Sequence, residues 1–499
     1  MSKTRLLAID QGTTSTRAVM FDERAKPLAT AQVPLPQIYP RDGWVEHDPE
    51  EIWRATLAVC RDVMTQTGGV NGVAAIGITN QRETSVVWER TTGKPIANAV
   101  VWQDRRGAAM CDALRKAGEE PRIQKLTGLL ADSYFSATKV SWLLDNVAGA
   151  RAAAEKGALA FGTIDTFLLW RLTGGKIHAT DATNASRTML FDIHRGDWDQ
   201  GLLDLFKVPK AILPRVGNTA EVYGVTEKSL FGAEIPIAAL VGDQQSALVG
   251  QAGFRAGDIK STYGTGCFVL VNSGPVALAS THRLLTTVAY RLNGATTYAL
   301  EGSIFNAGTA VQWLRDSLKL FTDAKDTEIM AAKTSGPSRV FFVPAFTGLG
   351  APFWDPDARG ALLGLTRDTT PAEIVRAALE AVCLQTQDLL ATFRADGVAA
   401  PRVLRVDGGM SANGWLLQYL ADITGVPVER PVYRETTVLG AAFLAGLGAG
   451  LFSSLADVES AWQRDVRAAP RMTARERETT LAAWADAVRR VRGPIWAQA

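Results

Sequence analysis

A short turn near the start of the chain carries groups suited to binding phosphate. The segment Asp10-Gln11-Gly12-Thr13-Thr14-Ser15-Thr16-Arg17 lies between two apolar runs. Its successive hydroxyls and the amides freed by glycine can donate to phosphate oxygens, Arg17 adds a fork-shaped cation, and Asp10 offers a hard oxygen for Mg²⁺. The GxxxxGK(S/T) pattern of a Walker loop is absent here. A polar hairpin tip is the alternative interpretation of this turn taken alone.

A second turn of this kind follows about 250 residues later, which indicates a repeated unit. Asp258-Ile259-Lys260-Ser261-Thr262-Tyr263 leads into Gly264-Thr265-Gly266 and then into Cys267-Phe268-Val269-Leu270-Val271. Two strand–turn–strand units, one opening each half, predict a duplicated architecture with a cleft between the copies. Two facing phosphate hairpins would form a nucleotide clamp, and this favours the functional interpretation of both.

Charged side chains follow two apolar runs that are predicted to be buried strands. Asp243 follows the predicted strand 237–241, at the end where open α/β sheets place their ligands, and its carboxylate can accept the proton of an attacking hydroxyl. An N-cap for the next helix is the alternative. Arg82 and Glu83 follow the strand 74–79, and adjacent opposite charges can hold a small polyol. A surface salt bridge is the alternative for this pair.

A glycine pair follows a later predicted strand, 403–406. Gly408-Gly409 lets the backbone pass close to a flat ligand, which Asn413 can then hydrogen-bond. A turn that starts the next helix is the alternative.

The elements that would position these groups alternate between strands and helices, so the chain is predicted to be α/β. Its 499 residues exceed the roughly 250–300 that one core usually spans, so two domains are expected, 1–252 and 253–499, with the boundary at 250–257. Asp48-Pro49-Glu50-Glu51 predicts a helix start in which Glu51 completes a capping box. The uncharged stretch 436–456 is predicted to be a buried helix rather than a membrane span.

Composition narrows the class of protein. The net charge of +2, without a long basic stripe, argues against a dedicated nucleic-acid binder. The four cysteines form neither a CxxC pair nor a zinc-ligand spacing with the histidines, so a reducing cytoplasm is expected. No signal peptide is expected before the first strand.

Read together, these segments resemble the FGGY carbohydrate kinase family over nearly the whole chain. Both family signatures are present, from Tyr134 to Leu143 and from Gly360 to Glu380. Other segments are similar to the members that phosphorylate glycerol: DQGTTSTR from Asp10, GWVEHDPEEIW from Gly43, ITNQRET from Ile78, TNASRTMLFDIH from Thr183, GDQQSAL from Gly242, TYGTGCF from Thr262 and PAFTGLGAPFWDPDARG from Pro344.

The resemblance implies two actin-like (ribonuclease-H-like) domains that close over a cleft, with glycerol and the first hairpin in 1–252 and the nucleotide in 253–499. The implied reaction transfers the ATP γ-phosphoryl to glycerol, giving sn-glycerol 3-phosphate at the entry of glycerol catabolism. ATP and Mg²⁺ are the implied cofactors. Homo-dimers or homo-tetramers are implied, without nucleic acid or a membrane span.

Site residues are implied by the same resemblance, position by position. Those that bind glycerol are Arg82, Glu83, Tyr134, Asp243, Gln244 and Phe268, and Asp243 is also the base. Those that meet the nucleotide are Thr13, Thr14, Ser15, Arg17, Thr265, Gly308, Gln312, Gly409 and Asn413, and Asp10 helps to hold Mg²⁺.

Two other functions compete with this interpretation, and one segment departs from the family. A kinase for xylulose or gluconate is disfavoured because Arg82, Glu83, Tyr134 and Phe268 match a pocket for a small triol. An actin-like ATP-binding protein without an acceptor substrate would not need a convergent arginine, glutamate and tyrosine. The stretch 227–234 lacks the glycine run and the arginine of members that fructose 1,6-bisphosphate inhibits. We therefore expect a catalytically complete enzyme without that control.

Overall fold

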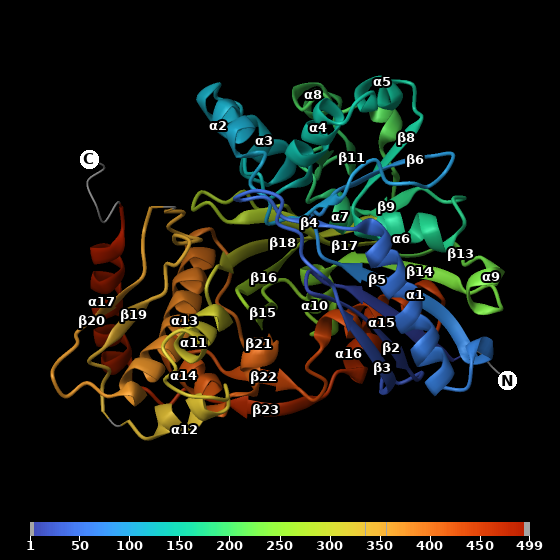
Figure 1. Ribbon diagram of the computed structural model, residues 1–499. Helices are drawn as coiled ribbons and strands as arrows, with labels where there is room; N and C mark the ends of the chain where they lie inside the picture. Colours follow the sequence, from blue (N-terminus) through green and yellow to red (C-terminus); the bar gives the residue numbers. More distant parts are fainter. Residues whose placement is uncertain (1–3, 335, 356, 494–499) are drawn as a thin grey trace.

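The computed structural model describes residues 4–334, 336–355 and 357–493, and two large mixed β-sheets organise them (Figure 1). The first sheet has the order β13-β14-β5-β1-β2-β3, and the second has the order β17-β18-β16-β15-β21-β22-β23. Their strands are β1 (Arg5–Gln11), β2 (Ser15–Phe21), β3 (Pro27–Pro34), β5 (Val73–Asn80), β13 (Ala220–Val225), β14 (Pro236–Gly242), β15 (Ile259–Tyr263), β16 (Cys267–Gly274), β17 (Leu285–Leu292), β18 (Ala295–Ile304), β21 (Leu404–Asp407), β22 (Val428–Pro431) and β23 (Arg464–Ala468).

The two sheets repeat one topology. In the first, β1, β2 and β3 form an antiparallel meander, β5 and β14 continue in parallel from β1, and β13 closes the edge antiparallel. In the second, β15, β16 and β18 are antiparallel neighbours in the corresponding places, with β17 added beyond β18; β21 and β22 continue in parallel from β15, and β23 closes the other edge antiparallel. The predicted α/β fold, built from two similar units, is confirmed.

Helices cover both sheets, and shorter strand pairs fill the insertions. The helices are α1 (Pro49–Gln66), α2 (Ala108–Lys116), α3 (Glu120–Thr127), α4 (Ser136–Asn146), α5 (Ala150–Glu155), α6 (Ile164–Leu172), α7 (Ala182–Ala185), α8 (Gln200–Leu205), α9 (Lys228–Phe231), α10 (Asp243–Gly250), α11 (Gly308–Asp316), α12 (Asp326–Ala332), α13 (Pro371–Ala395), α14 (Gly414–Thr424), α15 (Thr436–Gly448), α16 (Leu455–Ala461) and α17 (Ala474–Val491). The strand pairs are β4 (Glu46–His47) with β7 (Ala99–Val100), β6 (Val86–Glu89) with β8 (Leu159–Gly162), β9 (Ala179–Asp181) with β12 (Arg215–Gly217), β10 (Phe191–Asp192) with β11 (Asp197–Trp198), and β19 (Phe341–Val343) with β20 (Ala361–Leu363).

The start of α1 differs in one detail from the prediction. Asp48 is the N-cap and its side chain accepts from the Glu50 amide, as its residue type predicts. The predicted capping box is wrong, because the Glu51 carboxylate pairs with Arg54 one turn later rather than with the backbone of Asp48. An exposed arginine at i+3 is a competing partner for this carboxylate.

The uncharged stretch 436–456 begins with the buried helix α15, as predicted, and α15 packs on the first sheet although it follows strands of the second (Figure 1). Small residues allow this approach. A Cβ on Gly440 would lie 1.9 Å from the carbonyl oxygen of Ser246 in α10, and one on Gly250 would lie 2.0 Å from that of Thr436. Any larger residue would force these helices apart. No helix within the described residues is long and apolar enough to cross a membrane.

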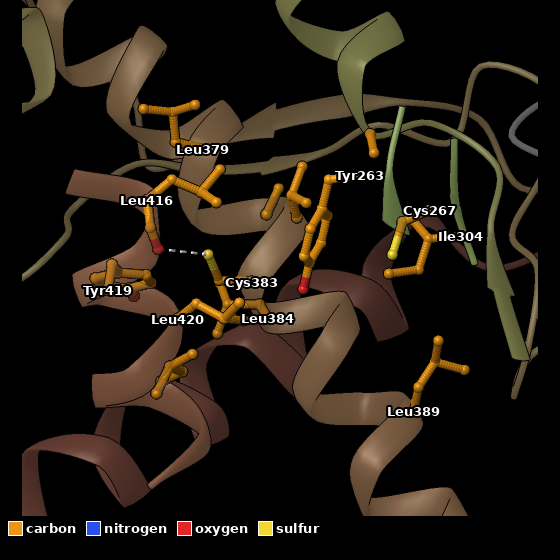
Figure 2. Close-up of a cluster of buried hydrophobic side chains, with 14 of the residues drawn as sticks. Tyr263, Cys267, Ile304, Leu379, Cys383, Leu384, Leu389, Leu416, Tyr419 and Leu420 are labelled. Atoms are coloured by element: carbon orange, nitrogen blue, oxygen red, sulfur yellow. Dashed lines mark hydrogen bonds between the residues drawn. The ribbon is translucent and has the colours of Figure 1, made fainter. Parts of the chain in front are cut away.

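The core of the second half supports its glycine-rich turn (Figure 2). Tyr263, the last residue of β15, inserts its buried ring between the strands and α13, where its hydroxyl lies 2.9 Å from that of Thr386. Beside it, the Cys383 thiol points to the carbonyl oxygen of Leu416 in α14, 3.8 Å away. All four cysteines are buried free thiols. The strand end that carries Gly264 and Thr265 is therefore anchored to a rigid core.

Candidate active site

The predicted catalytic residues meet at one edge of the first sheet. Strands β1, β5 and β14 are parallel neighbours, and their register pairs Asp10 with Thr79 and Gly242 with Asn80. The carboxyl ends of parallel strands lie at the same edge, so Asp10, Arg82 and Asp243 come together there. Asp243 is the first residue of α10 and Gly242 is the N-cap, so the N-cap interpretation of Asp243 is wrong.

Arg82 is the centre of a buried ion-pair cluster. Its Nε lies 3.0 Å from Oδ1 of Asp243, while Nη1 and Nη2 donate to the two carboxylate oxygens of Glu301 at 2.5 and 3.1 Å. Arg82 is 2% exposed and Glu301 is 1% exposed. Burial alone would raise the pKa of Glu301, but Arg187 and Arg82 together lower this pKa to about 2. Both arginines therefore face an ionised carboxylate.

Glu83 completes the cluster from the next position. Its Oε1 accepts from Nε of Arg187 at 2.5 Å, and both side chains are buried. The backbone of Glu83 has a φ of +62°, in the left-handed region that costs a glutamate on the order of 1–3 kcal/mol. The hydroxyls of Ser85 and Ser136 hold that backbone by donating to its carbonyl oxygen. Because Arg82 and Glu83 are both buried, the alternative interpretation of these two residues as a surface salt bridge is wrong.

Aromatic rings and a glutamine surround these charges. The ring centroid of Trp102 lies 5.5 Å from that of Tyr134 and 6.5 Å from that of Phe268. The Tyr134 hydroxyl accepts from Nη2 of Arg82 at 3.4 Å. The side-chain oxygen of Gln244 accepts from Nζ of the buried Lys260 at 2.5 Å. Apolar ring faces beside buried hydrogen-bonding groups suit a small polyol, whose carbons and hydroxyls need both.

The first hairpin touches this cluster directly. The indole Nε1 of Trp102 donates to the Thr13 hydroxyl at 2.9 Å, and Gln32 donates to the Ser15 hydroxyl at 2.8 Å. Thr14 is exposed at the tip. Arg17 forms an ion pair with Glu435, the residue just before α15. An incoming phosphate would therefore compete with Glu435 for the Arg17 guanidinium.

The second hairpin is held by backbone hydrogen bonds to itself and to the start of α11. Gly264 donates its amide to Gly266, and exposed Thr265 accepts from two amides at the start of α11. Gly308 opens α11, and a Cβ there would lie 2.5 Å from the Gly264 carbonyl oxygen. Gln312 is exposed one turn further along this helix. Only glycine allows the helix to start this close to the turn.

The glycine pair after β21 adjoins this hairpin, because β21 runs parallel to β15. Gly408 has a φ of +82°, and a Cβ there would lie 2.4 Å from the Tyr263 carbonyl oxygen. Gly409 faces open space at the start of a 3₁₀ turn. Asn413 is the N-cap of α14, accepting from the Leu416 amide at 2.9 Å. The helix-start interpretation of Asn413 is thus correct, and a role toward a nucleotide stays a prediction.

Two family models match successive parts of the chain. The N-terminal domain model of the FGGY family of carbohydrate kinases matches residues 5–250, and the C-terminal domain model matches residues 259–449. The chain belongs to the FGGY family. It is 60% identical over 489 residues to a glycerol kinase of Rhodospirillum centenum, covering 98% of each chain. Glycerol kinase 1 of Pseudomonas aeruginosa is 56% identical over 488 residues, covering 98% of this chain and 99% of that one.

Solved structures extend the comparison to three dimensions. The fold is similar to that of Plasmodium falciparum glycerol kinase with ADP, with a TM-score of 0.93, 37% identity and 98% coverage of each chain. A xylulose kinase from Lactobacillus acidophilus matches with a TM-score of 0.87 over 97% of each chain. At 23% identity, this second likeness shows the shared FGGY fold alone.

The site of this FGGY kinase also contains residues that the sequence analysis did not select: Trp102, Arg187, Lys260 and Glu301. Arg187 lies inside a recognised segment, and Glu301 is a single acidic residue in a buried strand, which is an unusual place for a charge. An acidic residue in a predicted buried strand could therefore have indicated Glu301 as a candidate site residue. Its partners Arg82 and Arg187 could not be predicted in this way, because they lie more than a hundred residues away in the sequence.

The carboxylates at the sheet edge fit the Mg²⁺ that ATP-dependent kinases use. The side chain of Asp10 accepts no hydrogen bond within the described part of the chain, and Arg17, Asp243 and Glu435 are its charged neighbours. Burial raises the pKa of Asp10 to about 7; Arg17 opposes this rise, while Asp243 and Glu435 add to it. A divalent cation would relieve this cost, and Mg²⁺ is commonly held by one or two carboxylates together with phosphate oxygens and waters.

Proposed function

We propose that this chain catalyses the ATP-dependent phosphorylation of glycerol to sn-glycerol 3-phosphate, an entry step of glycerol catabolism. The contact between Arg82 and Asp243 carries the proposal. It places a carboxylate beside a buried guanidinium at the ligand-binding edge of the sheet, in a chain 60% identical to a glycerol kinase. The relative solved with ADP supports ATP as the phosphoryl donor.

Asp243 acts as the general base. Its side chain is 29% exposed, so it faces both the buried cluster and the open edge where the reacting groups meet. As the terminal oxygen of glycerol attacks the γ-phosphorus in line, the Asp243 carboxylate takes the hydroxyl proton. The N–H of Arg82 fixes the orientation of that carboxylate and keeps one oxygen engaged while the other accepts the proton.

The remaining polyol contacts fix the substrate. Oε1 of Glu83 is occupied by Arg187, which leaves its second oxygen to accept from another glycerol hydroxyl. Arg82, Tyr134 and Gln244 add polar contacts, and Phe268 packs with Trp102 against the carbon backbone. Holding the attacking oxygen in place supplies a large part of the rate enhancement in phosphoryl transfer.

The nucleotide lies between the two hairpins. Its phosphates bind the hydroxyls and amides of Thr13, Thr14 and Ser15, with Arg17 as the cationic partner. Thr265 and Gly308 meet it from the second half, and Gln312, Gly409 and Asn413 line the nucleoside side. Asp10 helps to hold Mg²⁺, which when bound neutralises charge on the transferring phosphoryl group. Closure of the domains 1–252 and 253–499 keeps water from competing as the nucleophile.

We place the enzyme in the cytoplasm, which its free thiols favour, as a homo-dimer or homo-tetramer.

A substrate panel tests the proposal. ADP release is measured with ATP, Mg²⁺ and either glycerol, dihydroxyacetone, xylulose or gluconate, and the highest kcat/KM is expected for glycerol. A higher kcat/KM for xylulose or gluconate would reassign the enzyme to a sugar within the same family. ATP hydrolysis that none of these acceptors stimulates would instead favour an actin-like ATPase.

A further inference from the structure

Glu301 reaches the polyol site from the other half of the molecule. It lies on β18 of the second sheet, whereas its partners Arg82 and Arg187 belong to the first half. Strand β17, the neighbour of β18, lies against α7, which leads into Arg187 (Figure 1). The second sheet therefore contributes a side chain to the interior of a site whose other charges come from the first half.

The carboxylate of Glu301 contacts both arginines in a defined geometry. Oε2 accepts from Nη1 of Arg82 at 2.5 Å, while Oε1 accepts from Nη2 of Arg82 at 3.1 Å and from Nη2 of Arg187 at 3.0 Å. All three side chains are at most 2% exposed. The two terminal nitrogens of Arg82 also donate to Gln245 at 3.2 Å and to the Tyr134 hydroxyl at 3.4 Å, and its Nε is the nitrogen that faces Asp243.

Glu301 also separates two like charges. Without its carboxylate, Glu83 would be the anion left near both guanidinium groups, with its Oε1 2.5 Å from Nε of Arg187 and 3.9 Å from Nε of Arg82. Arg82 would then be drawn toward Asp243 and Arg187 toward Glu83, the two acids proposed to contact the substrate. Because water is excluded, such a rearrangement is not screened.

We propose that Glu301 is a positioning residue for phosphoryl transfer, which holds Arg82 on Asp243 and Arg187 on Glu83 and so sets both acids for the polyol. This role rests on the proposed function. It also makes the geometry of the polyol site depend on where the second half lies, since the bridge spans both halves.

Three variants of the full-length enzyme test the role. Glu301→Gln keeps the size of the side chain and replaces an acceptor oxygen with an amide donor, which opposes one guanidinium. Glu301→Asp keeps the charge and shortens the reach. Glu380→Gln is the matched control, because Glu380 is also 1% exposed and pairs with an arginine, Arg376, but shares no partner with the cluster.

The readouts are kcat and KM for glycerol, the Kd of ATP by calorimetry, and the thermal unfolding temperature. Glu301→Gln is expected to lower kcat/KM for glycerol at least about 100-fold, with the Kd of ATP within about twofold of wild type. Glu301→Asp should recover about tenfold of that loss and stay about tenfold below wild type, because the charge and one contact remain but the shorter side chain cannot reach both arginines. Glu380→Gln should lower the unfolding temperature without this kinetic effect.

A folded Glu301→Gln protein with kcat/KM within about threefold of wild type would overturn the role, as would an equal kinetic loss in Glu380→Gln. If Glu301→Gln does not fold, Glu301→Asp decides, and wild-type kinetics in that variant overturn the role. Wild-type enzyme that fails to phosphorylate glycerol refutes the proposed function itself. An active wild type with an equally active Glu301→Gln refutes only this inference.

Discussion

Nε of Arg82 lies 3.0 Å from Oδ1 of Asp243, and the two residues follow neighbouring parallel strands, β5 and β14. The sheet therefore places the guanidinium beside the carboxylate that we propose as the base. Oδ1 of Asp243 also accepts from the Gln244 amide at 2.7 Å, so the carboxylate is held through one oxygen. The other oxygen is the one that we propose accepts the hydroxyl proton of the substrate.

Replacing Asp243 with asparagine tests its role as the base. Asp243→Asn should lower kcat at least roughly 10²-fold, the usual size of general-base effects, because the amide cannot accept the hydroxyl proton. Glycerol affinity should fall less, since one hydrogen-bonding oxygen remains. Steady-state kinetics at saturating ATP give both quantities. Asp145→Asn, at a partly exposed aspartate paired with Arg151, is the control and should keep the wild-type kcat. A near-normal kcat in Asp243→Asn would remove Asp243 from this role.

Removing the side chain of Arg82 tests the polyol assignment. Arg82→Ala leaves Glu301 paired with Arg187 alone and removes the guanidinium that contacts Asp243. Truncating one partner of a buried charge pair typically costs about 2–5 kcal/mol. KM for glycerol should rise steeply while nucleotide binding stays close to wild type. Calorimetry with ATP and with glycerol separates the two. Lost nucleotide binding with intact glycerol binding is the result that the assignment forbids.

Much of this site could be predicted from local sequence, because turns and strand ends are local features. Glycine and hydroxyl residues between apolar runs specify both hairpins, and parallel strands bring Asp10, Arg82 and Asp243 to one edge. The partners of these residues could not be predicted. Arg17 pairs with Glu435 and Arg82 pairs with Glu301 because distant segments pack against each other. The sequence alone does not distinguish these two glutamates from other acidic residues as partners.

Asn413 shows a different limit. Its residue type predicts a helix cap and a ligand contact equally well, and the structure places its side chain in the cap of α14. A capping side chain can still contact a ligand, because its amide nitrogen has two hydrogens and the structure uses one, which it donates to the Thr327 hydroxyl at 3.2 Å. Local sequence therefore predicted the position of Asn413 without distinguishing between its two uses.

Asp10 should make stability depend on pH with a recognisable sign. Its pKa is raised from 3.8 to about 7 in the folded protein, so the folded state binds a proton that the unfolded state has released above pH 4. This contribution to stability is complete below the unfolded pKa and is lost as the pH rises through about 7. Asp10→Asn removes the titration. Without Mg²⁺, the variant should gain unfolding temperature relative to wild type, more at alkaline than at acidic pH.

The same substitution should impair catalysis while it stabilises the fold. Thermal unfolding in a chelator, followed by titration of Mg²⁺ at fixed ATP, measures both effects. Wild type should need more Mg²⁺ for half-maximal rate below the pKa of Asp10, because the protonated carboxyl is a poor ligand. A wild-type Mg²⁺ requirement in Asp10→Asn would exclude Asp10 from the metal site.

The stretch 227–234 should leave the enzyme insensitive to fructose 1,6-bisphosphate. A site for two phosphates needs exposed backbone amides or arginine forks to replace their hydration. Here Lys228–Phe231 forms the short helix α9, the Gly232 amide donates to the carbonyl oxygen of Lys228, and Glu227 pairs with Lys176 at 2.5 Å. The Gly232 amide is therefore already hydrogen-bonded. Glu227 and Glu234 repel a polyanion, and the stretch contains one lysine to attract it.

We expect millimolar fructose 1,6-bisphosphate to leave the initial rate unchanged at saturating glycerol and ATP. The titration is run at several protein concentrations, because a site between subunits could borrow Arg255 or another donor from a second copy. A saturable drop in rate that grows with protein concentration would show that such a site exists and that the segment has been misinterpreted.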